Sequence, residues 1–175
     1  MVLCNSSVIE NTCKFLNASN VGNLSSSAEQ TTLKSKDGSV LKGFATILES
    51  IIRSQRPNEF TPCGAEEMAQ LRQWLEFCIC VVNYADKQAA SLKELNDHLS
   101  TVNYLVGNQI SVADAILYFI VHPILTKSTM HEKEQLCHIS RWFSTVQQHP
   151  KIRSSDEYKL ISFSRNILYG NVSKH

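Results

Sequence analysis

The spacing of apolar residues predicts helices over most of the chain, with a short β segment in its first third. One helical face is formed by Val8, Ile9, Thr12, Cys13 and Leu16. Residues 17–29 are rich in Asn, Ser and Gly and predict a loop. Residues 31–34 and 39–41 have the character of strands, and Asp37-Gly38 between them predicts a hairpin turn.

Helical spacing returns after the hairpin and continues to the C-terminus. Pro57 and Pro62 bracket a linker, and a last helical segment is expected at 158–169. The helical faces between these points are Phe44-Ile47-Leu48-Ile51-Ile52, Met68-Leu71-Leu75-Cys78-Ile79-Val82, Leu92-Leu95-Leu99-Val102 and Leu136-Ile139-Trp142-Phe143-Val146.

A local start signal precedes the most apolar helix. Gly107 can take the left-handed conformation that ends one segment, and Ser111-x-x-Asp114 has the spacing of a capping box. The run at 115–121 is apolar nearly all round, so we expect a central, buried helix. Ser111 and Asp114 are therefore predicted to be structural N-cap residues without a chemical role.

These elements predict a mostly helical α+β chain in two unequal parts. The boundaries fall at residues 1–56 for a small N-terminal α+β domain, 57–63 for the linker and 64–175 for an all-α bundle.

The composition argues against several classes of binding partner. The chain of 175 residues carries 17 basic and 16 acidic residues, a net charge of +1, so no overall field attracts nucleic acid or an anionic membrane. The longest apolar runs are far shorter than the ~20 residues of a bilayer span. The six cysteines form no disulfide framework. With no secretory signal at the N-terminus, we expect a cytosolic protein without a membrane partner.

No constellation of residues predicts catalysis or a bound metal. The six histidines include no His-x-x-x-His pair, and Cys137-His138 lacks ligand spacing. Gly107-Asn108-Gln109 lacks the lysine and further glycines of a phosphate loop. We therefore expect no catalytic residue, no metal and no cofactor.

Several of these residues match a known superfamily. Gly-x-x-x-Ser-x-Ala-Asp before the central helix, with a Trp-bearing helix that ends in His-Pro, resembles the C-terminal domain of the glutathione transferase superfamily. The matching residues are Gly107, Ser111, Ala113, Asp114, Trp142 and His149-Pro150. The resemblance implies an abbreviated thioredoxin-like N-terminal part followed by the transferase-like helical domain.

Within that superfamily, the chain resembles the auxiliary proteins of the multi-aminoacyl-tRNA synthetase complex. The strings that carry this likeness are Leu71-x-x-Trp74-Leu75-Glu76, Leu105-x-Gly107, Ser140-Arg141-Trp142-Phe143 and Leu168-Tyr169. The resemblance implies a non-catalytic scaffold that supports translation in the cytosol and allows a nuclear pool. The alternatives are a glutathione transferase or a transferase-like subunit of an elongation factor 1 complex.

Three departures argue against the transferase alternative. Only about 60 residues precede the helical part, fewer than a complete thioredoxin-like domain requires. Thr31 occupies the position of the superfamily's cis-proline, where a cis bond before a non-proline residue is costly. Lys42 and Gly43 replace the polar pair that holds the γ-glutamyl end. We therefore expect no glutathione binding.

The resemblance implies two docking surfaces. The first would bind the transferase-like appendage of methionyl-tRNA synthetase and maps onto Leu41, Phe44, Ile47, Ile51, Ala65, Met68 and Arg72. For Ile47, Ile51 and Met68, a place in the hydrophobic core is an equal alternative. The second is centred on Arg141, whose planar guanidinium suits stacking, and would bind the transferase-like domain of glutamyl-prolyl-tRNA synthetase or another such domain.

Basic residues in the last part of the chain leave room for weak tRNA contact. Asp156 and Glu157 dilute this group, and a phosphate footprint needs several aligned cations. We therefore expect a solvated face as the main role of Lys151, Arg153, Lys159, Arg165 and Lys174.

Overall fold

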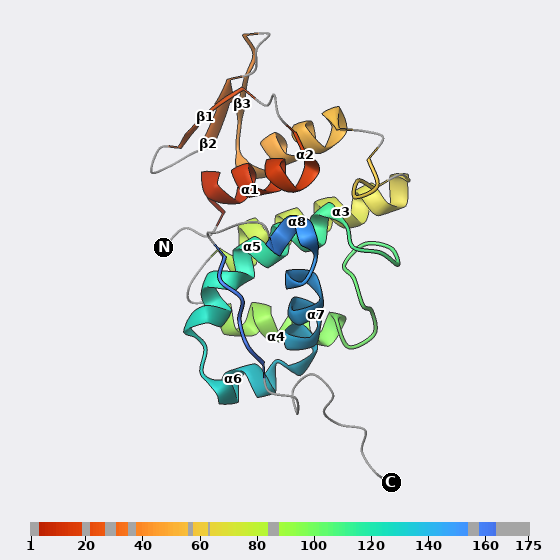
Figure 1. The fold of residues 1–175 in the computed structure, drawn as a ribbon. Coiled ribbons are helices and arrows are strands. Elements are labelled where there is room, and N and C mark those ends of the chain that lie inside the picture. Colours follow the sequence, from red (N-terminus) through yellow and green to blue (C-terminus); the bar gives the residue numbers. More distant parts are fainter. Residues whose placement is uncertain are drawn as a thin grey trace.

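The structure is a computed structural model that describes residues 4–18, 22–26, 31–34, 38–55, 58–62, 64–83, 88–153 and 158–163. Figure 1 shows the three strands with α1 and α2 at one end of a helical bundle. The predicted mostly helical α+β class is confirmed. No helix in these ranges is both long and apolar enough to cross a bilayer.

The N-terminal part consists of helix α1 (Ser6–Leu16), a three-stranded sheet and helix α2 (Phe44–Ser54). Asn5 begins α1 by accepting a hydrogen bond from the Val8 N–H at 3.2 Å, and Asn17 ends it with a φ of 56°. The strands are β1 (Asn23–Ser26), β2 (Thr31–Lys34) and β3 (Val40–Lys42), antiparallel in that order.

The sheet confirms the predicted hairpin and corrects the predicted loop. β2 and β3 pair as expected, but β1 lies inside residues 17–29. Leu24 of β1 pairs with Leu33 of β2, which pairs in turn with Leu41 of β3, so three leucines align across the sheet. With a single apolar side chain in its four residues, β1 has little local signal, and its pairing with β2 forms it.

The described part of the bundle has helices at four of the five predicted segments and contains two further ones, α6 and α8. Its elements are α3 (Ala65–Phe77), the π-helix η1 (Cys78–Val82), α4 (Gln88–His98), α5 (Val112–Lys127), α6 (Met130–Gln135), α7 (Cys137–Gln147) and α8 (Pro150–Arg153). Residues 112–122 of α5 are all buried, which confirms the predicted central helix.

The predicted helix at 158–169 is wrong over its described part. Residues 158–163 have no helical hydrogen bonds, and side chains of α5 and α7 bind their backbone instead. The rest of that prediction, at 164–169, lies outside the described residues.

The hydrophobic core continues from the N-terminal part into the bundle. Phe15 of α1 lies 4.7 Å from Phe60 and 5.7 Å from His149, measured between ring centroids. The Val112 N–H, at the start of α5, donates to the Phe60 carbonyl at 2.8 Å. The domain division at 57–63 stays a prediction.

Candidate docking surfaces

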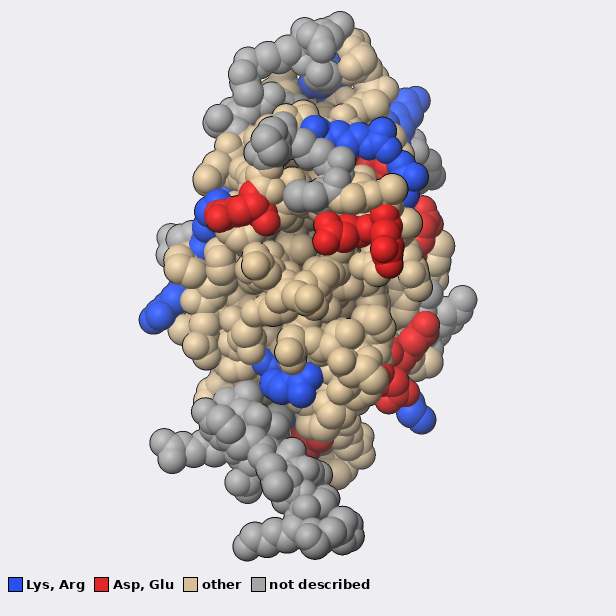
Figure 2. Space-filling view, turned by 90° about the vertical axis from the view of Figure 1, so that its right-hand side faces the viewer, with Lys and Arg blue, Asp and Glu red and all other residues tan. Residues whose placement is uncertain are grey.

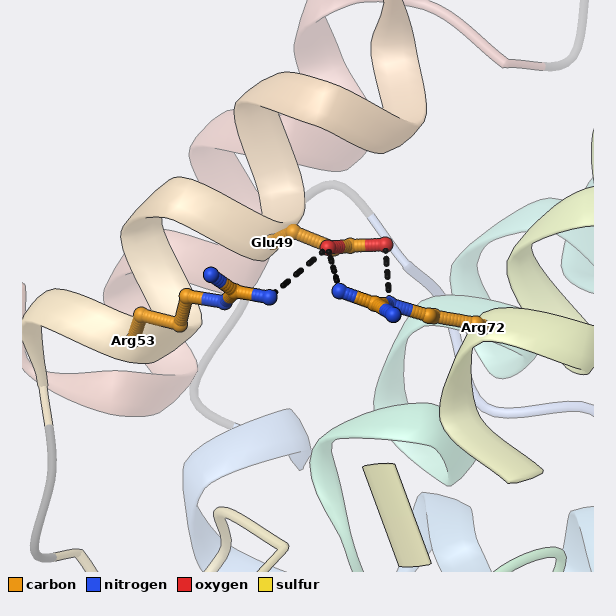
Figure 3. Close-up of polar contacts among 3 residues, drawn as sticks. All are labelled: Glu49, Arg53 and Arg72. Atoms are coloured by element: carbon orange, nitrogen blue, oxygen red, sulfur yellow. Dashed lines mark hydrogen bonds and ion pairs between the residues drawn. The ribbon is translucent and has the colours of Figure 1, made fainter. Parts of the chain in front are cut away.

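The face shared by α2 and α3 carries a bidentate ion pair. Both oxygens of Glu49 on α2 accept hydrogen bonds from the Arg72 guanidinium on α3, at 3.0 Å each. Arg53, one helical turn after Glu49, adds a contact of 3.6 Å. Figure 3 shows both guanidinium groups converging on the one carboxylate. This arrangement ties α2 to α3 and fixes the orientation of Arg72.

The seven residues predicted for the first surface divide into two layers. Phe44, Ile47 and Ile51 are buried, with exposed fractions of 8%, 0% and 3%. They belong to the core beneath the face and present no side chain to a partner. The other four reach the surface: Leu41 and Met68 are half-buried, and Ala65 and Arg72 are exposed. Docking at this face stays a prediction for those four.

The sequence did not indicate Glu49 as part of this face. Its spacing from Arg53 is that of an i,i+4 pair, which is a readable local signal. Its stronger partner, Arg72, lies 23 positions further along the chain. Only the packing of α3 against α2 brings those two groups together.

Arg141 on α7 is half-buried and held by backbone carbonyls. Its Nη2 donates to the Leu99 carbonyl at 2.7 Å and to the Val102 carbonyl at 3.4 Å, both in the turn that follows α4. The Leu99 carbonyl directly follows the C-terminal end of α4, where the helix dipole favours a cation such as the guanidinium. The structure thus gives Arg141 a role inside the chain, and its predicted contact with a partner stays a prediction.

The residues on either side of Arg141 point inward. Ser140 is buried and donates from its hydroxyl to the Lys133 carbonyl at 3.0 Å. Trp142 is buried and donates from its indole nitrogen to Asp114 Oδ1 at 2.8 Å. Of this string, only Arg141 is available to act at the surface.

Asp114 is a buried carboxylate that accepts four hydrogen bonds within the bundle. It forms a capping box with Ser111, whose N–H and hydroxyl donate to Oδ2 at 2.9 and 2.8 Å. Its Oδ1 accepts from the Leu105 N–H at 3.0 Å and from Trp142. The predicted N-cap role of Ser111 and Asp114 therefore agrees with the geometry. Burial raises the pKa of the Asp114 carboxyl, and the four hydrogen bonds oppose that shift.

The strand end at Thr31 and Gly43 has its backbone paired internally. The Gly43 N–H donates to the Thr31 carbonyl at 3.0 Å, and Thr31 itself is buried. Gly43 has a φ of 94°, which favours glycine at this position. The Gly43 N–H and the Thr31 carbonyl are therefore hydrogen-bonded to each other.

Two buried cysteines of the N-terminal part, Cys4 and Cys13, are poorly suited to nucleophilic chemistry. No group of three or more His, Cys, Asp or Glu side chains that could hold a metal occurs in the described ranges. Burial raises the pKa of Cys4 to about 12 and that of Cys13, also beside Glu10, to about 11. Both side chains are therefore neutral thiols at physiological pH rather than nucleophilic thiolates.

Basic side chains are interspersed with acidic ones. The Lys151 ammonium lies 4.3 Å from the Phe60 ring centroid and 4.0 Å from a Glu59 carboxylate oxygen. Figure 2 shows one face of the molecule, on which both signs of charge surround a broad uncharged area. Two members of the predicted basic group, Arg165 and Lys174, lie outside the described residues.

Comparison with known proteins gives three further findings. Residues 67–150 match a family model for the nuclear-export cofactor Arc1p, of the Arc1p N-terminal-like type. Mouse eukaryotic translation elongation factor 1 epsilon-1 is 34% identical over 142 residues, covering 79% of this chain and 80% of the mouse protein. Mouse bifunctional glutamate/proline–tRNA ligase is 26% identical over 110 residues, covering 62% of this chain and 7% of the ligase.

The fold also has solved counterparts. A possible glutathione S-transferase from Rhodopseudomonas palustris superposes with a TM-score of 0.67 at 18% identity, covering 85% of this chain and 90% of that one. This likeness establishes the glutathione transferase-like fold that the sequence predicted. The 34% identity to the mouse protein over most of both chains shows that this chain belongs to the family of eukaryotic translation elongation factor 1 epsilon-1.

Proposed function

We propose that this chain is a non-catalytic adaptor of the multi-aminoacyl-tRNA synthetase complex, which docks transferase-like domains of synthetases in support of translation. The observation that carries the proposal is the similarity to a short part of a bifunctional glutamate/proline–tRNA ligase. A synthetase-type enzyme thus contains a segment related to this chain. A two-fold pair of like modules uses the same self-complementary patch on both partners, so a related segment of a synthetase is a fitting partner for this chain.

The first proposed surface is formed by Leu41 of β3 and by Ala65, Met68 and Arg72 of α3, and it would bind methionyl-tRNA synthetase. Leu41 and Met68 each present a half-buried apolar side chain, and Ala65 leaves room for a partner to approach. Arg72 lies at the edge with half of its side chain exposed, although Glu49 holds it in place. An apolar centre with a preordered arginine at the rim is the usual anatomy of a protein interface.

The second proposed surface is centred on Arg141 and would bind glutamyl-prolyl-tRNA synthetase or another transferase-like domain. The Leu99 and Val102 carbonyls restrict the guanidinium before any partner arrives. A group that is already ordered loses less conformational entropy on binding. Its planar face then remains suited to stacking on an arginine or an aromatic ring.

The two surfaces lie on different elements, and the proposal requires that both can be occupied at once. β3 belongs to the sheet at one end of the molecule in Figure 1, whereas α7 lies further along the bundle. A chain with two such surfaces can bridge two enzymes. We place this function in the cytosol with a nuclear pool, and any tRNA contact is secondary.

Charge-reversal variants and native mass spectrometry of the purified complex test the proposal. We expect Arg72→Glu to release methionyl-tRNA synthetase alone and Arg141→Glu to release the partner of the second surface alone. Arg153→Glu makes the same charge change on α8 and should release neither. Arg141→Lys keeps the charge without the planar fork and should weaken the second contact.

The same experiment identifies a wrong proposal. If Arg141→Glu retains every synthetase and its circular dichroism melt matches wild type, the second surface is wrong. Retention by glutathione-agarose together with turnover of a chlorinated aromatic substrate would establish the transferase alternative. Recovery with nucleotide-exchange subunits in place of synthetases would establish the elongation factor 1 alternative.

A further inference from the structure

Residues 158–163, which we call the strap, lie extended against α5 and α7. Two side chains of these helices bind the strap through its backbone. The Gln147 carboxamide donates to the Ile161 carbonyl at 3.0 Å and accepts from the Ile161 N–H at 3.1 Å. His122 Nε2 lies 2.8 Å from the Lys159 carbonyl. Figure 1 shows the strap as a blue segment along the bundle.

The Gln147 contact is a form of peptide recognition. A carboxamide carries a donor and an acceptor side by side, so it can pair with both backbone groups of one residue as a neighbouring β-strand does. Gln147 and His122 are both buried, with exposed fractions of 6% and 8%. Hydrogen bonds shielded from water in this way are stronger, and leaving these groups unpaired would be costly.

Three of the strap's six side chains lie against the bundle and three are exposed to solvent. Tyr158, Ile161 and Phe163 are half-buried, whereas Lys159, Leu160 and Ser162 are exposed. The half-buried residues thus form an aromatic-x-x-aliphatic-x-aromatic pattern.

Aromatic rings of α5 and α7 lie against the two aromatic residues of the strap. Tyr158 lies 4.9 Å from Phe119 and 4.9 Å from His122, measured between ring centroids, and Phe163 lies 5.9 Å from Phe143. Aromatic pairs at these separations are favourable beyond the area that they bury. The face of α5 and α7 therefore binds both the backbone and the side chains of an extended segment.

We infer that this face is a peptide-binding site which the chain fills with its own strap. Its ligand class is an extended segment with the same apolar spacing, supplied by a partner protein. None of the residues involved belongs to the two proposed docking surfaces, so the inference stands independently of the proposed function. A partner segment can bind only to molecules whose site is not occupied by the strap. Its apparent affinity is therefore the intrinsic affinity multiplied by the fraction of molecules in which the site is free.

A labelled hexapeptide with the sequence of residues 158–163 is the probe, and fluorescence anisotropy measures its binding to the full chain. Tyr158→Ala/Phe163→Ala removes the strap's ring anchors and leaves the site intact. We expect this variant to bind the peptide about tenfold more tightly than wild type, because the site is free more often. Adding Gln147→Ala should abolish that gain.

Lys159→Ala/Ser162→Ala is the matched control, since it makes two substitutions at exposed strap positions and should bind the peptide as wild type does. Hydrogen exchange supplies a second readout with the strap anchors in place. Gln147→Ala alone should speed exchange of the Ile161 amide, which has lost its acceptor.

Three results would overturn the inference. Equal peptide affinity in wild type and the anchor variant would show that the strap does not compete. Unchanged exchange at Ile161 in Gln147→Ala would show that the carboxamide does not hold the strap. Loss of the cooperative melt in the anchor variant would make the strap an inseparable part of the core.

Discussion

Asp114 shows how one residue joins three parts of the bundle. Its two oxygens accept from the loop before α5, from the cap of α5 and from α7. Ser111 and Asp114 could be predicted from the sequence because the two members of a capping box are only three positions apart. Leu105 and Trp142 could not be predicted as partners, because their contacts with Asp114 depend on how the loop and α7 pack.

At this scale we predict that Asp114→Asn destabilises the chain by about 2 kcal/mol, as expected when a buried donor loses its acceptor. All four partners are donors, so the amide NH2 of asparagine must face at least one of them. Urea denaturation monitored by circular dichroism measures the effect. Asp97→Asn makes the same change at an exposed position of α4 and should leave the midpoint unchanged. Equal midpoints for both variants would contradict the prediction.

At the scale of elements, the strength of the local pattern decided what could be predicted. The faces of α2, α5 and α7 repeat over 11 to 16 residues and are clear in the sequence. α6 has only six residues and no buried side chain, so it lacks such a face. Its capping box of Thr129 and Glu132 was the available signal. β1 forms through its pairing with β2, and the strap is held by side chains of α5 and α7.

At the scale of elements, we predict the effect of substituting Gly107 in the turn before α5. Gly107 has a φ of 67°, and a Cβ there would lie 3.3 Å from Glu67 Oε1. We expect Gly107→Ala to cost about 1–2 kcal/mol, since it combines backbone strain with this close contact. Gly107→Asn should cost less, because asparagine tolerates positive φ better than alanine. Thermal melts rank the variants, and a melt of Gly107→Ala equal to wild type would show that the turn adapts freely.

At the scale of the whole molecule, His149 marks the junction between the N-terminal part and the bundle. Its ring packs on Phe15 and Phe60, and Nδ1 is buried without a hydrogen-bond partner among the described residues. Burial and the nearby Lys151 charge lower the pKa of His149 below 6.5, while Glu59 opposes the shift. The protonated ring is therefore disfavoured at this junction.

This junction should make stability depend on pH. Above pH 6.5 the ring is neutral in both states; as the pH falls below 6.5 the unfolded chain takes up a proton first, so stability is lost down to the folded-state pKa. We expect His149→Phe to reduce this loss, measured by urea titrations above and below that pH. His131→Phe, at an exposed position of α6, should leave the loss as in wild type. An unchanged pH dependence in His149→Phe would contradict the prediction.

The sequence by itself determined the fold class, the main helices, the cap of α5 and the absence of a familiar catalytic motif, because these depend on periodicity and on groups a few residues apart. The tertiary structure decided which predicted surface residues are accessible. Ile47 and Ile51 share a helix with Glu49, yet they are buried and it reaches the surface. It also decided the Asp114 network, the Glu49–Arg72 pair and the strap. These contacts join residues far apart in the chain, and only packing sets their separation in space.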